Sequence, residues 1–171
     1  MNEFYYSPFK ENFLEQCHNI NEENVPEVGS RSLDDFKELV DKSDFSLCVA
    51  EDNSPLGYII CFQNNKNTNE YMDKIGHKNY TEIRKRIDSF LYVDRVAIDV
   101  KYRNKKLGSN LYYKAIDFAK KNSIANLAAE INLLPRINTS SLNFHKKLEF
   151  VEIDKIKYAD DYEVSLQKMI I

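Results

Sequence analysis

Hydrophobic positions near the start of the chain follow helical spacing. Residues 8–20 (PFKENFLEQCHNI) are predicted to form a helix whose apolar face consists of Phe9, Phe13, Leu14 and Cys17. A polar, turn-rich segment follows it. A second helix is predicted to begin at Ser32 or Asp34 and to run to about Val40, because both residue types favour helix N-termini.

Two apolar runs then predict an antiparallel hairpin. Residues 45–50 (FSLCVA) and 56–62 (LGYIICF) have strand composition, and residues 51–55 (EDNSP) between them form a strong turn signal. Residues 63–88 are polar, with a short helix expected at 81–87. Ordered connections of that length usually serve as lids or binding loops.

Strand and helix patterns alternate in the second half of the chain. This alternation predicts an α/β fold with a mixed sheet that contains a parallel pair of strands. No repeat or linker interrupts the pattern, so we expect a single domain over residues 1–171. The predicted strands are residues 90–98, 126–133, 150–153 and 163–169, and the predicted helices are residues 107–119 and 138–148.

Composition supports a folded globular protein. The 171 residues are 43% hydrophobic and 30% charged, which argues against disorder and against a fibrous repeat. The longest apolar run, residues 56–62, is far shorter than the roughly 20 residues of a membrane span. The first residues, MNEFYYSPFK, lack the pattern of a secretory signal. We therefore expect a cytoplasmic protein without a membrane partner.

Cysteine and histidine spacing does not suggest a metal site or a disulfide framework. The cysteines form no CxxC pair, and the histidines form no HExxH or HxH motif. Two of the cysteines lie in apolar runs, where a thiol behaves as a small hydrophobic group. We therefore expect no metal cofactor. The residues concerned are Cys17, Cys48, Cys61, His18, His77 and His145.

Positive charge is concentrated in one segment of an acidic chain. The net charge is −3, but residues 101–121 hold seven basic residues and one acid, which gives +6 there and −9 elsewhere. Such a focus favours one anionic ligand bound at one place. It argues against a nucleic-acid surface, which usually makes a whole domain basic.

Residues 96–109 (VAIDVKYRNKKLGS) combine a strand, a basic turn and a helix start. The first turn of a helix carries N–H groups without intrahelical acceptors and a partial positive charge, which together suit a phosphate or diphosphate. Gly108 would allow close approach of the backbone, and Arg103, Lys105 and Lys106 would add charge. The alternative is a solvated basic loop that only precedes a helix.

This segment resembles the acetyl-CoA loop of the GNAT (GCN5-related N-acetyltransferase) superfamily, Q/R-x-x-G-x-G/A after a strand. Arg103 matches the leading Q/R, Gly108 the second glycine position, and Ile98 the valine that ends the strand. Lys106 stands where the first glycine is usual, and Val100 stands where proline is common.

A second family motif lies downstream. Residues 138–150 (NTSSLNFHKKLEF) resemble N-x-x-A-x-x-x-Y-x-K-x-G-F, with His145 in place of the tyrosine and Glu149 in place of the glycine. The segments NVPEVGS (24–30) and YVDRVAI (92–98) are similar to one bacterial and archaeal branch of predicted acetyltransferases. The positions in register in the downstream motif are Asn138, Ser141, His145, Leu148 and Phe150.

The resemblance implies a fold and a cofactor site. In the GNAT fold, the strand before the loop splays from its neighbour, and its main chain bonds the pantetheine arm. The amides of the following turn would hold the diphosphate. The acetyl-CoA-binding residues implied in this way are Val96, Ala97, Ile98, Arg103, Asn104, Lys105, Lys106, Leu107, Gly108, Ser109, Asn138 and Ser141.

The implied chemistry is direct attack of an amine on the thioester, with the CoA thiolate leaving. His145 aligns with the family tyrosine that protonates the thiolate, and an imidazole with a pKa of about 6.5 is able to do the same. The alternative is a histidine that only packs beside the pantetheine. Asn138 has a second reading as the N-cap of its helix.

Two carboxylates are candidates for the base that deprotonates the amine. Asp94 lies within an otherwise apolar strand, and Glu130 lies on the next strand. A buried carboxylate must be paired or used in catalysis. Arg95 is expected on the opposite face from Asp94, so an ion pair between them is not expected. Ordered water is the alternative to either base.

The acceptor site is the least determined part of the sequence interpretation. Residues 63–88 are expected to fold over the acceptor end, with Tyr80, Tyr92 and Asn132 touching the amine. The alternative for this segment is a cover over a sheet edge.

Acetyl-CoA and an amine of a small molecule or a protein are the expected partners. The alternative function is a catalytically weakened acyl-CoA-binding module. A nucleic-acid binder is the least favoured, and a homodimer is one candidate oligomeric state.

Overall fold

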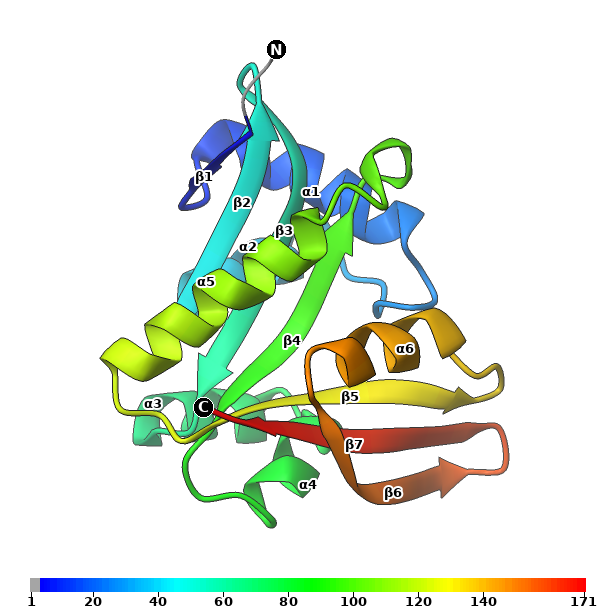
Figure 1. Ribbon diagram of the computed structural model, residues 1–171. Helices are drawn as coiled ribbons and strands as arrows, with labels where there is room; N and C mark the ends of the chain where they lie inside the picture. The colour runs from blue at the N-terminus through cyan, green and yellow to red at the C-terminus, as the bar shows by residue number, and fades with distance from the viewer. Residues whose placement is uncertain (1–3) are drawn as a thin grey trace. The chain divides into compact units, whose positions relative to one another are not determined.

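The computed structural model describes residues 4–171 (Figure 1). Residues 1–3, part of the N-terminal stretch used to argue against a signal sequence, lie outside the described residues. The elements in chain order are β1 (Tyr5–Ser7), α1 (Glu11–Glu23), α2 (Leu33–Lys42), β2 (Phe45–Glu51), β3 (Ser54–Gln63), α3 (Lys66–Lys74), α4 (Lys78–Arg84), β4 (Leu91–Ile98), the 3-10 helix η1 (Val100–Tyr102), α5 (Leu107–Lys121), β5 (Asn126–Leu134), α6 (Thr139–Lys147), β6 (Val151–Ala159) and β7 (Tyr162–Ile170).

The seven strands follow the order β1-β2-β3-β4-β5-β7-β6 in one hydrogen-bonded sheet. β4 and β5 pair in parallel at Leu91 with Leu127 and at Tyr92 with Ala128, whereas β5, β7 and β6 pair antiparallel. The mixed α/β fold with a parallel pair, expected from the alternation of elements, is therefore confirmed. No helix in the described part of the chain has the length and apolarity to cross a membrane.

Contacts divide the chain into two compact units. The first consists of residues up to Phe62 together with residues 93–118. Its β2–β3 hairpin turns at Asp52 and Asn53, which both have positive φ values, as a tight two-residue hairpin turn requires. The predicted hairpin is confirmed. β1 adds a short antiparallel strand beside β2, which sequence reasoning did not anticipate.

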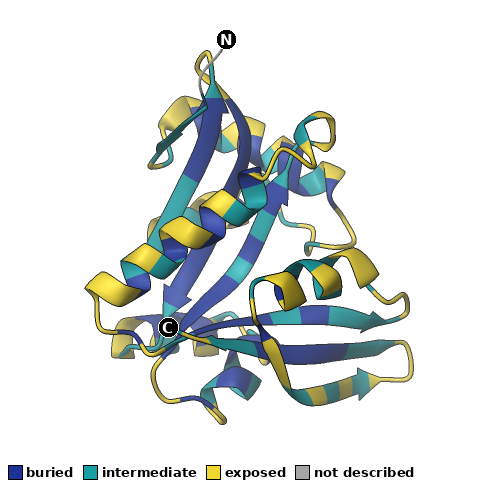
Figure 2. Cartoon of the chain, viewed as in Figure 1, coloured by how far each residue is buried: buried dark blue, intermediate teal, exposed yellow. Residues whose placement is uncertain are grey.

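Helices cover both faces of the strands in this first unit (Figure 1). On one face, Phe36 of α2 packs edge-to-face on Tyr58 of β3, with ring centroids 5.3 Å apart. On the other face, Phe118 of α5 lies over Phe45 of β2. Figure 2 shows β3 to be buried along most of its length, which explains why this strand reads as a continuous apolar run rather than as an alternation.

The second unit consists of residues 63–92 and 119–171. Here α6 lies alongside β5 (Figure 1), and α3 and α4 occupy the segment predicted to be mostly a polar connection. Sequence reasoning missed α3, because it expected only one short helix in that region. The available signals were Asn65, which caps α3 by accepting a hydrogen bond from Thr68 N, and the buried positions Thr68, Tyr71 and Met72 at helical spacing.

Gly57 allows β3 to approach the end of β4 closely. A Cβ atom built at Gly57 would lie 2.7 Å from the carbonyl oxygen of Ala97 and would also meet the side chain of Ile98. The backbone oxygen cannot move aside as a flexible side chain can. The close approach therefore fixes where β4 ends and where the following turn begins.

We expect Gly57→Ala to lower the melting temperature by about 3–10 °C, because the added methyl group forces β3 and β4 apart at a cost of about 1–3 kcal/mol. Differential scanning calorimetry measures the shift. Gly29→Ala is the control, since a Cβ at Gly29 meets nothing within 4 Å. Equal melting temperatures for the Gly57 variant and the wild type would show that the close approach carries no constraint.

Candidate functional site

The basic turn after β4 adopts the backbone conformation that an anion-binding turn requires. Asn104 and Lys106 both have left-handed φ values, +64° and +61°. Glycine is the usual residue in that conformation, because other side chains strain it. Lys106, which replaces the first glycine of the family motif, thus has the backbone shape that glycine would give.

Helix α5 begins directly after this turn. The amide of Asn110 donates to the carbonyl of Lys106 at 3.0 Å, the first bond of the helix. Leu107, Gly108 and Ser109 therefore form the first turn, where N–H groups have no intrahelical acceptor and the helix dipole is positive. Backbone shape and dipole together make this a site for a phosphate group.

Two basic side chains of the turn have defined partners. Lys105 Nζ lies 4.8 Å from the centroid of the Tyr102 ring, a cation–π contact that keeps its charge beside the turn. Arg103 donates from Nη2 to Oδ1 of Asn24 at 2.7 Å. Sequence reasoning gave Arg103 an anion-binding role and did not foresee that its guanidinium bonds a buried residue of the α1–α2 connection.

The carboxylate of Asp94 pairs with Arg95, contrary to expectation. Arg95 Nε donates to Asp94 Oδ2 at 2.7 Å, and both side chains are buried. Strand alternation fixes the direction of each Cβ but not the end of a long side chain, so the guanidinium reaches its neighbour's carboxylate. Arg95 Nη1 also donates to Asn21 Oδ1 and to the carbonyl of Gly29. Asp94 thus belongs to a buried network that fixes α1 and its connection on β4.

Glu130, the second candidate base, accepts a hydrogen bond from the phenol of Tyr92 at 2.5 Å. This length is typical of a hydroxyl that bonds a charged carboxylate. The Tyr92 ring in turn packs edge-to-face on His77 and Tyr80, with centroids 5.5 and 5.7 Å away. Three side chains, from β4, α4 and the N-cap of α4, therefore support the Glu130 carboxylate.

Tyr80 and Tyr92 are buried, although the sequence interpretation placed them in contact with the acceptor. The Tyr80 hydroxyl donates to Asn69 Oδ1 of α3 at 2.7 Å. Neither ring presents a surface to solvent, because each fills the core between helices and strands. Asn132 is half-buried on β5, and its carbonyl accepts from the amide of Asn138 at 3.0 Å.

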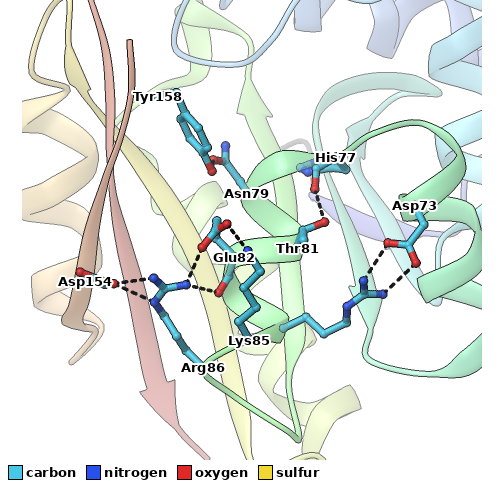
Figure 3. Close-up of polar contacts among 10 residues, drawn as sticks. Asp73, His77, Asn79, Thr81, Glu82, Lys85, Arg86, Asp154 and Tyr158 are labelled. Carbon is cyan, nitrogen blue, oxygen red and sulfur yellow. Dashed lines mark hydrogen bonds and ion pairs between the residues drawn. The ribbon is translucent and has the colours of Figure 1, made fainter. Parts of the chain in front are cut away.

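One ion pair joins the segment predicted to cover the acceptor to β6, and others join its helices to each other (Figure 3). Arg86 bonds Asp154 of β6 through Nη2 at 2.7 Å and Glu82 of α4 through Nη1 at 2.8 Å. Arg84 pairs with Asp73 of α3 at 2.8 Å. These bonds join α3, α4 and β6 into one structure, which neither the helix nor the strand pattern predicted.

A second contact joins α4 to the β6–β7 hairpin near Glu130. Asn79 accepts from the Tyr158 hydroxyl at 2.9 Å, as Figure 3 shows, and donates to the Tyr162 hydroxyl at 3.3 Å. Burial is the main cause that raises the pKa of Tyr158 to about 12, and the nearby charge of Glu130 contributes to the rise. Sequence reasoning missed these tyrosines, for which the only signal was the aromatic pair flanking the hairpin turn.

Helix α6 begins as its motif predicted. Oδ1 of Asn138 accepts from the amide of Ser141 at 3.0 Å, so the N-cap interpretation of Asn138 is confirmed. His145 is one turn after Ser141 and only 4% exposed. Its ring packs edge-to-face on Phe150, with centroids 4.9 Å apart.

The hydrogen bonds of His145 determine its tautomer. Nδ1 lies 2.8 Å from the carbonyl oxygen of Ser141 and 3.2 Å from the Ser141 hydroxyl oxygen. The carbonyl oxygen only accepts, so the shorter contact favours the tautomer with the proton on Nδ1. Burial lowers the pKa of His145 below 6.5, and the ring is neutral at pH 7. In this tautomer Nε2 is the unprotonated ring nitrogen. That form differs from the proton donor that the sequence comparison assigned, since it must first receive a proton before it can give one.

The structure places the predicted residues in two groups. The first unit contains Asp94, Val96, Ala97 and Ile98 of β4, the turn at 103–106 and the start of α5. The second unit contains Tyr80, Tyr92, Glu130, Asn132 and the residues of α6. Arg95 and Asn24, which sequence reasoning gave no role, are buried polar residues that bond the first group.

Comparisons with known proteins agree with the fold. The profile of the acetyltransferase (GNAT) family matches residues 9–150. No curated protein matches the chain. Three solved structures with similar folds each share 13–14% identity with the chain. They are the ribosomal-protein-S18-alanine N-acetyltransferase from Escherichia coli (13% identity, TM-score 0.72, covering 99% of this chain and 94% of that one), Ard1 from Thermoplasma volcanium (14%, 0.76, 98% and 97%), and Arabidopsis thaliana Naa50 with a bisubstrate analogue, CoA-Ac-MVNAL (14%, 0.70, 97% and 97%).

The family profile covers most of the 171 residues and includes both motifs, the turn before α5 and helix α6. The chain therefore belongs to the GNAT family of acetyltransferases.

Proposed function

We propose that this protein is an acetyl-CoA-dependent N-acetyltransferase that transfers an acetyl group directly to a primary amine of a small molecule or a protein. The observation that carries the proposal is the left-handed turn at Asn104 and Lys106 followed by the first turn of α5. This arrangement suits the diphosphate of coenzyme A. The same chain also contains Glu130 and His145, which are the candidate base and the candidate proton carrier.

In this proposal the first unit binds the cofactor. The amides of residues 104–109 hold the diphosphate, Lys105 and Lys106 neutralise its charge, and the Ser109 hydroxyl adds a donor. The main chain of residues 96–98 bonds the pantetheine arm, as the family resemblance implies. Arg103 takes a different part, since its guanidinium bonds Asn24. Asn138 and Ser141 begin the helix that carries His145.

Glu130 is the proposed base for the acceptor amine. An amine at neutral pH carries an extra proton, which must leave before the nitrogen attacks the thioester carbon. The Tyr92 phenol fixes the Glu130 carboxylate, whereas the Asp94 carboxylate bonds the Arg95 guanidinium in the buried network. We therefore rank Glu130 above Asp94. Deprotonation through ordered water is the remaining alternative.

His145 is the proposed proton carrier to sulfur. As the new nitrogen–carbon bond forms and the carbon–sulfur bond breaks, the nitrogen must lose a second proton and the thiolate must gain one. The lone pair at His145 Nε2 accepts the proton from nitrogen and then delivers it to the thiolate. This role keeps the expected acid function while starting from the neutral tautomer that Ser141 fixes.

Acceptor binding is assigned to side chains at the edge of the Glu130 site. Tyr80 and Tyr92 support this site from the core, since both are buried. Asn132, Tyr158 and Tyr162 are half-buried and carry the polar groups that an amine substrate would meet. The carboxylate of Glu130 among these aromatic rings favours a cationic amine in water.

A catalytically weakened acyl-CoA-binding module is the second candidate, because resting His145 has no proton on Nε2. Single-turnover transfer from radiolabelled acetyl-CoA to a panel of primary amines separates the two. An enzyme transfers the label to at least one amine class. Tight CoA binding without transfer to any member would support the binding module.

We expect Gly108→Leu to raise the dissociation constant for CoA by well over tenfold, because its side chain blocks the approach of the diphosphate to the first turn of α5. Leucine favours helix more than glycine does, so the fold should not be weakened. Isothermal titration calorimetry measures the constant. Tyr113→Leu on the exposed face of α5 is the control. Unchanged affinity would mean that the diphosphate binds elsewhere.

Removal of the imidazole tests the proton carrier. We expect His145→Ala to lower kcat by roughly 10²- to 10⁴-fold and to change the affinity for acetyl-CoA much less. In the wild type, activity should fall only as the pH drops below 6.5 toward the lowered pKa of His145, because Nε2 is then already protonated. Lys146→Ala, on the exposed side of α6, is the control. A wild-type kcat in the alanine variant would exclude the role.

The proposed role of Glu130 as the base predicts two losses of kcat of different size. Glu130→Gln should lower kcat by about 10²-fold or more, because the amide cannot accept the amine proton. Tyr92→Phe should lower it by about fivefold to twentyfold, since the carboxylate stays but loses its fixed orientation. Steady-state kinetics with a saturating acceptor measure both, and Glu149→Gln at an exposed position is the control. If Glu130→Gln kept full kcat, water or another group would be the base.

A further inference from the structure

Asn24 forms the polar junction between helix α1 and the basic turn. It is the C-cap residue of α1 and only 8% exposed. Its Nδ2 donates to the carbonyl of Ile20 at 2.8 Å and to the carbonyl of Ile98 at 3.3 Å. Its Oδ1 accepts from Arg103 Nη2 at 2.7 Å. One buried amide thus bonds a helix end, a strand end and the turn.

The bonds to Ile98 and Arg103 span the start of the turn. Ile98 is the last residue of β4, and Arg103 follows η1 and leads to the left-handed positions. Between them, the amide of Asp99 donates to the carbonyl of Leu56 at 2.8 Å, and the Asp99 side chain caps η1. The backbone from β4 to Arg103 is therefore held at both ends, and Asn24 provides the hold at Arg103.

Asn24 is itself held in place by its neighbours in sequence. Glu22 accepts from the hydroxyl of Ser30 at 2.6 Å and from the amide of Arg31 at 3.0 Å. The Ser30 bond is the main cause that lowers the pKa of Glu22 to about 2, so the carboxylate stays charged at neutral pH. Asn21 and Arg95 both donate to the carbonyl of Gly29. The α1–α2 connection therefore packs back on α1 and on β4. These bonds hold Asn24 within hydrogen-bonding distance of Arg103.

An arginine without this partner would sample many rotamers at the exposed turn, and the turn would have to be ordered when the ligand binds. A hydrogen bond to a charged group is among the stronger side-chain bonds, and it acts here from a nearly buried acceptor. The turn is therefore arranged before the ligand arrives.

We infer that Asn24 is a positioning residue for diphosphate binding, which acts through Arg103 rather than by touching the cofactor. The inference rests on the proposed function, because it requires that the turn binds the diphosphate of CoA. It assigns a role to the first residue of the NVPEVGS segment, which the sequence comparison noted only as a similarity.

The test compares two acetyl donors. Acetyl-CoA carries the diphosphate, whereas S-acetylpantetheine has the same thioester arm without it. We expect Asn24→Ala to lower kcat/KM about tenfold with acetyl-CoA and less than twofold with S-acetylpantetheine. Val25→Ala, an exposed neighbour in the same connection, is the matched control and should change neither. An equal loss with both donors would mean that Asn24 only maintains the fold, which overturns the inference.

A double-mutant cycle tests the route through Arg103. If Asn24 acts through this guanidinium, Asn24→Ala should have little further effect on CoA affinity in an Arg103→Ala background. Fully additive losses would overturn the inference. Should Asn24→Ala not fold, Arg103→Lys breaks the same contact from its exposed end while keeping the charge, and it should show the same dependence on donor. If Arg103→Lys lowered kcat/KM equally with acetyl-CoA and with S-acetylpantetheine, the inference would be contradicted.

Failure of the inference is distinguishable from failure of the proposed function. Wild-type protein that binds no CoA in calorimetry would overturn both. Wild-type protein that binds CoA, with an Asn24→Ala variant that binds it equally well, would overturn only the role of Asn24.

Discussion

The left-handed turn between β4 and α5 is the constraint on which the functional interpretation depends. Asn104 and Lys106 accept backbone strain of roughly 1–2 kcal/mol each so that the chain can reverse direction just before the first turn of a helix. Strain of this kind persists only where surrounding structure enforces it. Gly57 and Asn24 provide that enforcement, one by close approach of β3 to β4 and the other by its bond to Arg103.

The other buried polar residues fall into two kinds. Some hold elements of the fold together, and others are the groups that the proposed reaction uses. Asp94 and Arg95 form a pair that joins β4 to the α1–α2 connection. Glu130 accepts a hydrogen bond from the Tyr92 phenol, and His145 Nδ1 bonds the backbone carbonyl of Ser141. A carboxylate held by a neutral phenol and an imidazole with a defined lone pair are the groups best suited to move protons in the proposed reaction.

Much of the fold could be predicted from sequence because its signals are local. The EDNSP turn between two apolar runs predicted the hairpin, and residues 107–119 predicted α5 through its apolar stripe. Helix α3 was missed because its few buried residues are interrupted by polar ones. The Asp94–Arg95 pair and the burial of Tyr80 depend on side chains that meet across elements, and no spacing along one strand encodes such a meeting. The same holds for Arg103, whose partner Asn24 lies far away in sequence.

The most direct test of the account is calorimetric titration of the protein with CoA at two salt concentrations. The account predicts one bound CoA per chain, with an affinity that weakens as salt rises, because cationic side chains of the turn bind a diphosphate. An absence of binding heat at either concentration, together with an unchanged melting temperature, would contradict it.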